Sequence, residues 1–481
     1  MIEKMKTKRV YILIALLGLF NVSCDSLLDI DTKHALPEEK IATVEGAEGM
    51  VIGVYDMLQD PSYFGRDMIT LPEVLADNCK LSITASRYKS HYDFQPRAQI
   101  DIWQTAYKQI GTLNEALANL DKLSETSKVK AVKGEALFLR AFNYFYLAMT
   151  YSRTPNHLVG GFDLCVPLIL DPFYNSGGNI NENASVARAK VSEVWTQIET
   201  DLTDAFDNLQ GNDNGMAPSR ISAIGVKAFM SRFYLYKEDW QKAVDAATYV
   251  IDNSSLTVYT GAYTDIFSKG SESIFQLMFT TSENLGSSSL QAMYGTYDDG
   301  VRDEDGFGNG KGSGEANLAL STQFMAAIDK VNDKRFSATR KVRLSGQELW
   351  WTTKYNSWGG IFGLDNIPLI RISEIYLNRA EGYARQNQYQ QSRNDLNHLR
   401  IRRNIGETPA SDASLLQEVL LQRRLELAFE GHRFFDLKRQ GMDITRPEGK
   451  PSIPYADFRI VSPISTTEMD VNKKLVNNPG Y

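Results

Sequence analysis

Apolar residues recur along most of the chain at the spacing of an amphipathic helix. In residues 102–123 they stand three or four positions apart, at Trp103, Ala106, Tyr107, Ile110, Leu113, Leu117 and Leu120. This spacing places them on one helical face. Residues 191–209 repeat the pattern. Residues 132–152 are apolar almost throughout, which predicts a central helix. Residues 413–439 close the helical part. The chain is therefore predicted to be mainly α-helical.

Two stretches each predict a pair of helices joined by a polar turn. Residues 222–252 bend at 237–239, and residues 372–403 bend near 386–388. Small residues after each turn let two helices approach closely, and the spacing resembles the tetratricopeptide helix-turn-helix unit. An ordinary antiparallel helix hairpin is the alternative. The degenerate match favours repeat-like pairs over a regular solenoid.

Three stretches break the helical period and carry many aromatic residues. They are residues 77–101, the Gly-, Ser- and Asp-rich residues 281–317, and residues 340–360. Loops held by a rigid scaffold are common binding sites. An aromatic ring can stack on the apolar face of a sugar, which predicts a glycan platform formed by Tyr88, Tyr92, Phe94, Tyr294, Tyr297, Trp350, Trp351, Tyr355 and Trp358. The alternative for each ring is a place in the core.

The first 24 residues predict export and a lipid anchor. Residues 10–20 are apolar, but these 11 residues are too few for a membrane span, which takes about 20. The basic residues before them and the small residues after them are typical of a secretory signal peptide, here residues 1–23. Cys24 ends a lipoprotein box in which Asn21 departs from the usual leucine. The alternative is an ordinary signal peptide with a cysteine close by.

Charge and cysteine content narrow the classes of partner and fold. The formal net charge is −7; residues 1–23 hold four basic residues and one acidic residue, so their removal makes it −10. Such an acidic chain is not expected to bind nucleic acid or anionic lipid headgroups. Cys79 and Cys165 are too few for a disulfide scaffold, and the sequence leaves open whether they pair.

The sequence holds no pattern typical of a metal or nucleotide site, and no cofactor is predicted. Lys311 is followed by Gly312, where a phosphate-binding loop needs serine or threonine. Residues 303–310 are rich in Asp and Gly, but Phe307 stands where a calcium loop needs an oxygen ligand. Calcium binding therefore stays open and without support.

Glu426 and Glu430 are spaced one helical turn apart and could act as an acid and a base in glycoside hydrolysis. However, Arg423, Arg424 and Arg433 lie in the same turns. Paired carboxylates and arginines on a half-buried helix favour an ion network that stays fully ionised. The same interpretation applies to Arg371, Glu374 and Glu381. An enzyme is therefore not predicted.

Several long blocks resemble the RagB/SusD family of nutrient-uptake outer-membrane lipoproteins. The most specific lie in the C-terminal half: IPLIRISEIYLNRAEGYAR (367–385), LNHLRIRR (396–403) and RRLELAFEGHRFFDLKRQG (423–441). The earlier ones are SCDSLLDID (23–31), WQTAYKQIGTLNEAL (103–117) and GEALFLRAFNYFYLAMTYS (134–152). The chain also ends in NNPGY, as the family usually does. The resemblance covers nearly the whole chain.

The resemblance implies a SusD-like fold, with tetratricopeptide-like helix pairs packed against a loop-rich, variable binding portion. Residues 24–481 would form one unit with an N-terminal region at 24–240 and a C-terminal region at 270–481. It implies a non-catalytic lipoprotein, acylated at Cys24 and held on the outer face of the outer membrane. It would bind oligosaccharides or polysaccharides and act as a hinged lid on a SusC-like TonB-dependent transporter. Some relatives take peptides instead, as in RagAB-type transporters. Ligand contacts in the family come from variable loops, so none is carried over to this chain.

Overall fold

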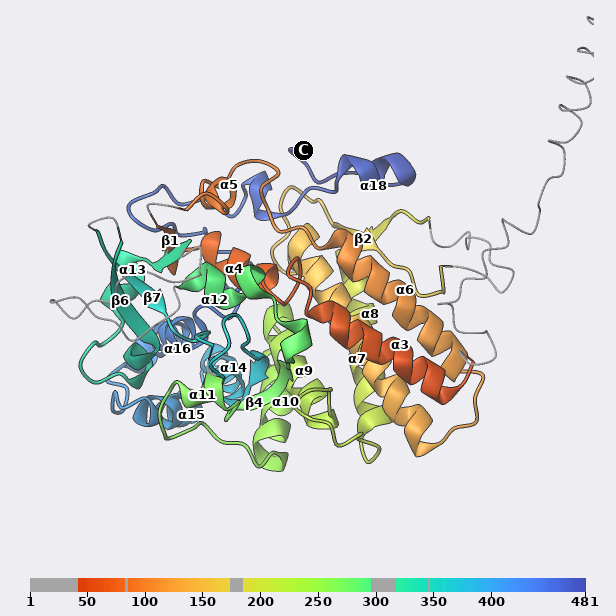
Figure 1. Ribbon diagram of the computed structural model, residues 1–481, viewed down its shortest axis with the longest axis horizontal. Helices are drawn as coiled ribbons and strands as arrows, with labels where there is room; N and C mark the ends of the chain where they lie inside the picture. Colours follow the sequence, from red (N-terminus) through yellow and green to blue (C-terminus); the bar gives the residue numbers. More distant parts are fainter. Residues whose placement is uncertain (1–41, 83–84, 174–184, 296–316, 345–346, 358) are drawn as a thin grey trace, which may run out of the picture.

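A bundle of long helices forms one half of the molecule (Figure 1). The structure, a computed structural model, describes residues 42–481 except 83–84, 174–184, 296–316, 345–346 and 358. The bundle consists of α3 (Val44–Leu58), α6 (Trp103–Leu120), α7 (Ser127–Tyr151) and α8 (Val191–Leu209). The central helix α7 is buried over most of its length and packs against the other three. The predicted helices at 102–123, 132–152 and 191–209 are therefore confirmed.

Both predicted helix pairs are present, with turns where the sequence places them. The first pair is α9 (Ala223–Lys237) and α10 (Trp240–Asn253), and the second is α14 (Ile372–Arg385) and α15 (Tyr389–Arg402). Helix α10 packs against α14, which joins the two pairs. Gly382 makes this approach possible, because a Cβ atom there would lie 2.7 Å from a Val244 methyl carbon.

The predicted helix at 413–439 is broken into two, which corrects the sequence prediction. Helix α16 covers Asp412–Leu427 and α17 covers Arg433–Arg439. Between them Phe429 and Gly431 adopt positive φ angles of 66° and 83°, which a helix does not accommodate. A Cβ atom on Gly431 would lie only 2.4 Å from the Met68 carbonyl oxygen, so the turn fits closely against a distant helix.

Short strands and helices connect these helices and cover their ends. The strands form four antiparallel pairs: β1 (Cys79–Leu81) with β5 (Leu318–Leu320), β2 (Leu164–Pro167) with β3 (Arg188–Lys190), β4 (Ser273–Leu277) with β8 (Ile367–Arg371), and β6 (Thr339–Leu344) with β7 (Gln347–Thr352). The short helices are α4 (Asp67–Val74), α5 (Lys89–Tyr92), α11 (Asp265–Ser268), α12 (Leu290–Tyr294), α13 (Thr322–Ala327) and α18 (Thr466–Val471). Single 3₁₀ turns cover Thr281–Glu283, Gly286–Ser288, Lys334–Ala338 and Phe458–Ile460.

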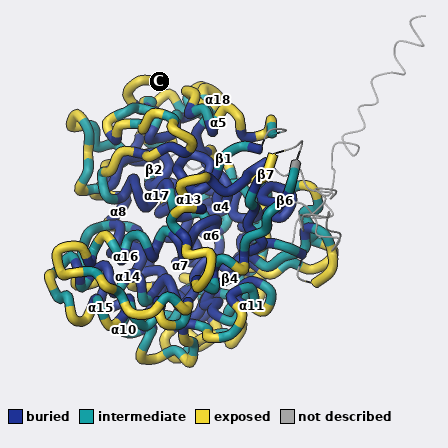
Figure 2. Tube along the Cα trace, turned by 90° about the vertical axis from the view of Figure 1, so that its left-hand side faces the viewer, coloured by how far each residue is buried: buried dark blue, intermediate teal, exposed yellow. Residues whose placement is uncertain are grey.

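A large aromatic core links the bundle to the helix pairs. Phe138, Phe142 and Phe145 of α7 surround Phe229 of α9, with ring centroids 5.2–5.6 Å apart. Such pairs add specific geometry to the burial of apolar area. The buried part of the trace runs through the interior of the whole body, and exposed segments lie at its edge (Figure 2). The scaffold that carries the loops is therefore continuous.

The two cysteines of the described region are free and buried. Burial raises the pKa of the Cys165 thiol to about 11 and that of Cys79 well above its usual value. Both thiols are consequently shielded and poorly nucleophilic. Among the described residues, no helix combines the length and the apolar character needed to cross a membrane.

Candidate functional site

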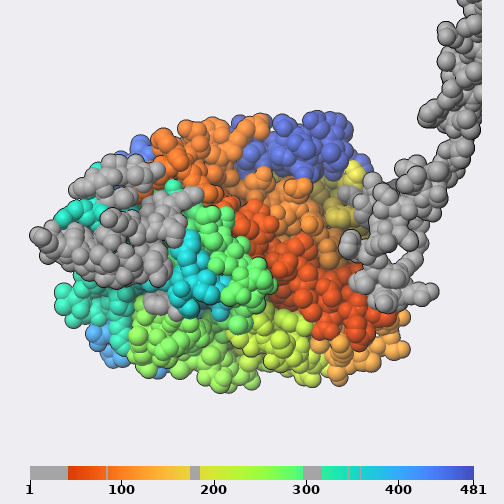
Figure 3. Space-filling view, in the orientation of Figure 1, coloured from red at the N-terminus to blue at the C-terminus, as the bar shows by residue number. Residues whose placement is uncertain are grey.

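The fold brings the three aromatic-rich stretches of the sequence to one end of the molecule. Strand β1 pairs with β5, and helix α12 contacts both α4 and β5. Strand β5 in turn lies against β7. In the space-filling view, the α5 region (orange) and the β6–β7 hairpin (blue-green) reach the surface at this same end (Figure 3). Segments more than 200 residues apart in sequence thus reach the surface at one end of the molecule.

Most of the predicted platform rings on this surface point inward. Tyr88, Tyr92 and Phe94 are 3%, 8% and 1% exposed. The Tyr88 hydroxyl lies 3.3 Å from that of Thr70 on α4. The rings of Tyr92 and Phe94 lie under the guanidinium of Arg446, 5.6 and 5.2 Å from its carbon. In this structure these three rings hold α5 onto the body and present no open face to a ligand.

Tyr294 and Tyr355 form a buried stack. Their ring centroids are 6.2 Å apart and their planes differ by 17°. The Tyr294 hydroxyl donates a hydrogen bond to the Ile69 carbonyl at 3.0 Å, and burial raises its pKa well above the usual value. The Tyr355 hydroxyl donates to the Phe429 carbonyl at 3.3 Å. Both rings therefore act as packing between α4, α12 and the turn after α16.

Trp350 and Trp351 are neighbours on β7, so their side chains point to opposite faces. Trp351 is 2% exposed and packs with Ala319, Val342 and Leu349. Trp350 is half-buried and rests against Phe336, with ring centroids 5.2 Å apart. Tyr297 and Trp358 lie outside the described residues. Of the predicted platform rings that the structure describes, Trp350 alone keeps part of its surface open.

An exposed ion pair lies beside Trp350 on the β6–β7 hairpin. Lys341 lies directly across from Trp350 in the β6–β7 ladder and binds Glu348, two residues before the indole, at 2.6 Å. Because this ion pair is exposed, its side chains can exchange partners at little cost. A partly open indole among such groups can stack on a sugar while its neighbours bind hydroxyls.

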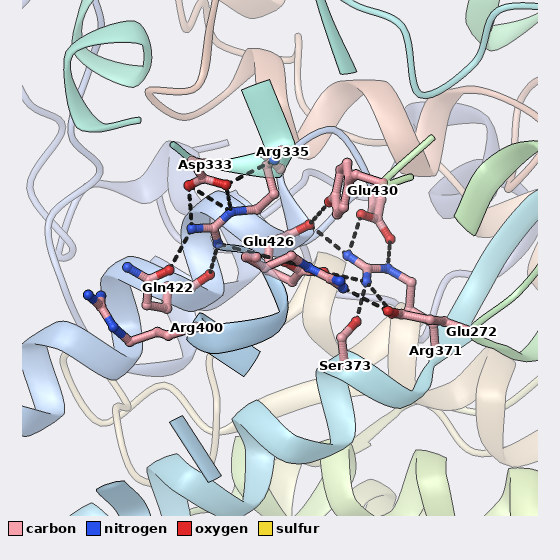
Figure 4. A network of polar contacts seen from close by, with 12 residues as sticks. Glu272, Asp333, Arg335, Arg371, Ser373, Arg400, Gln422, Glu426 and Glu430 are labelled. Carbon is pink, nitrogen blue, oxygen red and sulfur yellow. Dashed lines mark hydrogen bonds and ion pairs between the residues drawn. The ribbon is translucent and has the colours of Figure 1, made fainter. Parts of the chain in front are cut away.

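Beneath this surface, Arg371 at the end of β8 is the centre of a buried ion network (Figure 4). Its guanidinium contacts Glu272 at 3.0 Å and both Glu426 and Glu430 at 2.7 Å. Arg403 binds Glu272 at 2.7 Å and Glu426 at 2.8 Å. The network thus joins the residue before β4, the end of β8, the residue after α15, and α16 with the turn that follows it.

Two further cations extend the network toward the β6–β7 hairpin. Lys354, two residues after β7, binds Glu430 at 2.6 Å. Arg335 binds Asp333 at 2.7 Å and lies 3.6 Å from Glu426. With these pairs, four cations face four carboxylates. The base of the hairpin that carries Trp350 is therefore fixed to the C-terminal core.

The network keeps Glu426 and Glu430 ionised. Burial raises the pKa of Glu426, but Arg403 and Arg371 outweigh burial and hold that pKa well below 4.5. Burial likewise opposes Arg371 and Lys354 at Glu430, whose pKa is also lowered. A glycosidase acid needs a raised pKa and access to substrate. The pair has neither, and the predicted ion network is present.

The partners within this network differ from those that sequence proximity suggests. Arg424 and Arg433 bind Asp77, at 3.4 and 2.7 Å. Arg423 binds Asp436 at 2.8 Å. Glu426 and Glu430 instead pair with cations far away in sequence, and no local signal could identify them. Glu374 and Glu381 are also ion-paired, with Arg232 and Arg439, both at 2.6 Å.

The described residues contain no group of three or more His, Cys, Asp or Glu side chains that could hold a metal ion. The acidic loop at 303–310 lies outside them. The open side chains described at the site are the Trp350 indole and the charged groups of Lys341 and Glu348.

Family models match both halves of the chain. One, described as "SusD family", matches residues 335–481. Another, described as "Starch-binding associating with outer membrane", matches residues 28–235. The chain belongs to the SusD family.

Relatives of this SusD family member match over nearly its whole length. SusD-like protein P2 of Formosa agariphila is 25% identical over 541 residues, which cover 99% of this chain and 100% of the relative. The crystal structure of a SusD superfamily protein from Bacteroides thetaiotaomicron has a TM-score of 0.77 at 25% identity and covers 91% of this chain and 100% of that one. A SusD-like carbohydrate binding protein from Bacteroides vulgatus has a TM-score of 0.75 at 21% identity, with 90% and 97% covered. The predicted mainly helical, SusD-like fold is confirmed.

This SusD family member also has a groove that the sequence did not indicate. It has a volume of about 510 Å³ and lies between α6, the segment after β2 and α18. Trp103 and Tyr107 of α6 and Phe173 form part of its wall. The helical period at 102–123 predicts that Trp103 and Tyr107 are buried. It does not indicate that a groove lies beside them.

Proposed function

We propose that the mature chain is a cell-surface lipoprotein that binds oligosaccharide or polysaccharide nutrients and delivers them to a SusC-like TonB-dependent transporter. The observation that carries this proposal is the match of a starch-binding, outer-membrane family description to residues 28–235, together with the SusD family match at 335–481. A relative named as a carbohydrate binding protein shares the fold. In this proposal the protein is non-catalytic, because its buried carboxylate pair is committed to Arg371.

The surface around Trp350 is the proposed glycan site. Its indole is partly open and stands on a hairpin that the ion network fixes in place. Tyr297 and Trp358, which lie outside the described residues, remain proposed contacts from the sequence alone. Stacking and a few hydrogen bonds on an open site favour affinities of about 4–8 kcal/mol, from the millimolar to the micromolar range.

Calorimetry tests this site. The protein lacking residues 1–24 is titrated with a panel of oligosaccharides, and Trp350→Ala is compared with wild type on each ligand that binds. We expect the variant to lose at least about fivefold in affinity, because one stacking contact on an aromatic ring is worth about 1–3 kcal/mol. An unchanged affinity would remove Trp350 from the site. Binding of peptides but of no glycan would favour the peptide-binding alternative.

The anchor is proposed at Cys24, after removal of residues 1–23 as a signal peptide. Several acyl chains hold a protein firmly on a membrane, since affinity rises with each buried CH₂ group. Cys24→Ala should release the protein into the soluble fraction. Its partition is measured without the transporter, whose own binding could retain it. Persistent membrane association of this variant would contradict the anchor.

A further inference from the structure

The groove beside α6 has the properties of a docking site for a peptide segment. Its lining is mainly apolar and includes Trp103, Phe173, Val471 and Leu475. Its volume of about 510 Å³ falls within the range of ligand pockets, about 300–1,000 Å³. Val471 at its edge is 82% exposed in the described residues. An apolar groove of this size, open along one edge, is a candidate site for a segment that brings apolar side chains of its own.

A segment of the same chain has a matching pattern. Leu28, Asp29, Ile30 and Asp31 alternate between apolar and acidic side chains. In an extended backbone this alternation puts Leu28 and Ile30 on one face and both carboxylates on the other. The family match also begins at residue 28, well before the described residues start at 42. The segment therefore belongs to the matched domain and is more than a linker.

We propose that residues 28–31 dock into the groove, with Leu28 and Ile30 against its apolar wall. The carboxylates of Asp29 and Asp31 then face outward, where Lys108 lines the groove and Lys474 donates to the Ser185 carbonyl at its edge. Glu468 also lines the groove, and its carboxylate would repel Asp29 and Asp31 if they faced inward. The occupant is thus the chain's own N-terminal segment.

The chain between the docked segment and α3 is just long enough to reach the groove. Lys128 at the start of α7 pairs with Glu45 and Glu48 of α3, so α3 begins at that end. The groove lies at the other end of α7. Trp103, which lines the groove, packs on Tyr151, the last residue of α7, with ring centroids 5.1 Å apart. The 25 residues of α7 separate the two ends by roughly 35 Å at about 1.5 Å per residue. The stretch from residue 30 to 42 reaches about 40 Å when extended.

Docking would place the body close to its anchor. Only three residues separate Cys24 from Leu28. This consequence rests on the proposed acylation of Cys24, whereas the docking itself does not. The test below uses unlipidated protein and no glycan, so its failure would leave the proposed function untouched.

Disulfide trapping tests the docking in the chain of residues 24–481 carrying Cys24→Ser. Leu28→Cys is combined with Val471→Cys, and the intramolecular disulfide is followed under mild oxidation. The native Cys79 and Cys165 are buried with raised pKa values and do not compete. We expect this pair to form at least about tenfold faster than two controls, because docking raises the effective concentration of one thiol near the other.

The two controls separate docking from random encounter. Leu27→Cys with Val471→Cys places the thiol on the opposite face of the extended segment. Leu28→Cys with Val331→Cys uses a valine that is 89% exposed and lies in the loop after α13. Equal rates for all three pairs would overturn the proposal. A disulfide between two molecules would assign the groove to a second copy and would also overturn it.

Shortening the chain between the segment and α3 gives a second, independent test of the docking. Deleting residues 33–38 in the Leu28→Cys and Val471→Cys protein shortens the reach by about 20 Å. The disulfide should then be lost, although the thiol at position 28 and Ile30 both remain. Replacing the same six residues with Gly and Ser should retain it. A disulfide that survives the deletion would contradict the proposed path along the bundle.

Discussion

Arg371 and Glu430 are joined by two parallel hydrogen bonds, from Nε to Oε2 at 2.7 Å and from Nη2 to Oε1 at 2.9 Å. Both side chains are almost fully buried. Removing one charge from such a pair leaves the other buried and uncompensated. The pair therefore allows a direct test of how much the C-terminal core depends on its ion network.

Glu430→Gln should destabilise the protein by about 3–5 kcal/mol, the usual cost of breaking a buried ion pair. Arg371 would keep Glu272 and Glu426, but Lys354 would lose its carboxylate. Urea unfolding followed by circular dichroism measures the change. Asp412→Asn is the control, because Asp412 is exposed and pairs with Arg393 at the surface. Similar midpoints for both variants would contradict a structural role for the network.

Glu73 on α4 should make stability depend on pH. Burial raises the pKa of this carboxyl from 4.5 to about 7, although the Asn78 side chain donates to it at 2.8 Å. Between these values the folded state holds a proton that the unfolded state has released. Stability contributed by Glu73 is therefore full below pH 4.5 and is lost as the pH rises to about 7.

Glu73→Gln should remove this dependence. Near pH 4 the variant and wild type should unfold alike. At pH 8 the variant should be more stable by up to about 3 kcal/mol, the value of the pKa shift at about 1.4 kcal/mol per unit. Urea unfolding at both pH values measures the difference between the two proteins. A difference that does not change with pH would show that Glu73 titrates at its ordinary pKa.

Gly431 should tolerate no side chain. Its φ is +83°, and a Cβ atom would lie 2.4 Å from the Met68 carbonyl oxygen. Gly431→Ala must therefore move α4 or the turn, and should lower the melting temperature by several degrees. Gly406→Ala is the matched control, since its φ is +65° and no atom lies within 4 Å of its Cβ position. Equal losses would mean that backbone strain alone, and not the contact with Met68, determines the cost.

The two neighbouring tryptophans of β7 should separate binding from stability. Trp351→Ala should cost about 3–5 kcal/mol, because it empties a buried site. Trp350→Ala should cost clearly less, because its ring is half-buried, and should act mainly on glycan affinity. Thermal unfolding of both variants and calorimetry of the stable one measure these effects. The reverse order of stabilities would mean that Trp350 belongs to the core.

The helices and the turns within each helix pair could be predicted because their signals are local. Apolar spacing at 102–123 and the polar turns at 237–239 and 386–388 are properties of neighbouring residues. The break after α16 has no such signal. Phe429 adopts a positive φ, which the sequence alone does not indicate for a phenylalanine, and Gly431 is held by contact with Met68.

The candidate site was less predictable, since aromatic content does not tell which way a ring points. Tyr294 and Tyr355 stack on each other in the interior only because α12 and the segment after β7 meet there. Trp350 and Trp351 differ in burial only because successive side chains of β7 point to opposite faces of the strand. The groove beside α6 depends on α18, which is more than 300 residues away in sequence.

The buried ion network also orders events during the folding of a new chain. Lys354, Arg371 and Arg403 are synthesised before Glu426 and Glu430, their main carboxylate partners. Until those two glutamates arrive, closing the C-terminal half would bury cations without enough opposite charge, which is strongly unfavourable. A chain truncated before residue 426 should therefore stay open and sensitive to proteases, so compact folding requires that synthesis has passed residue 430.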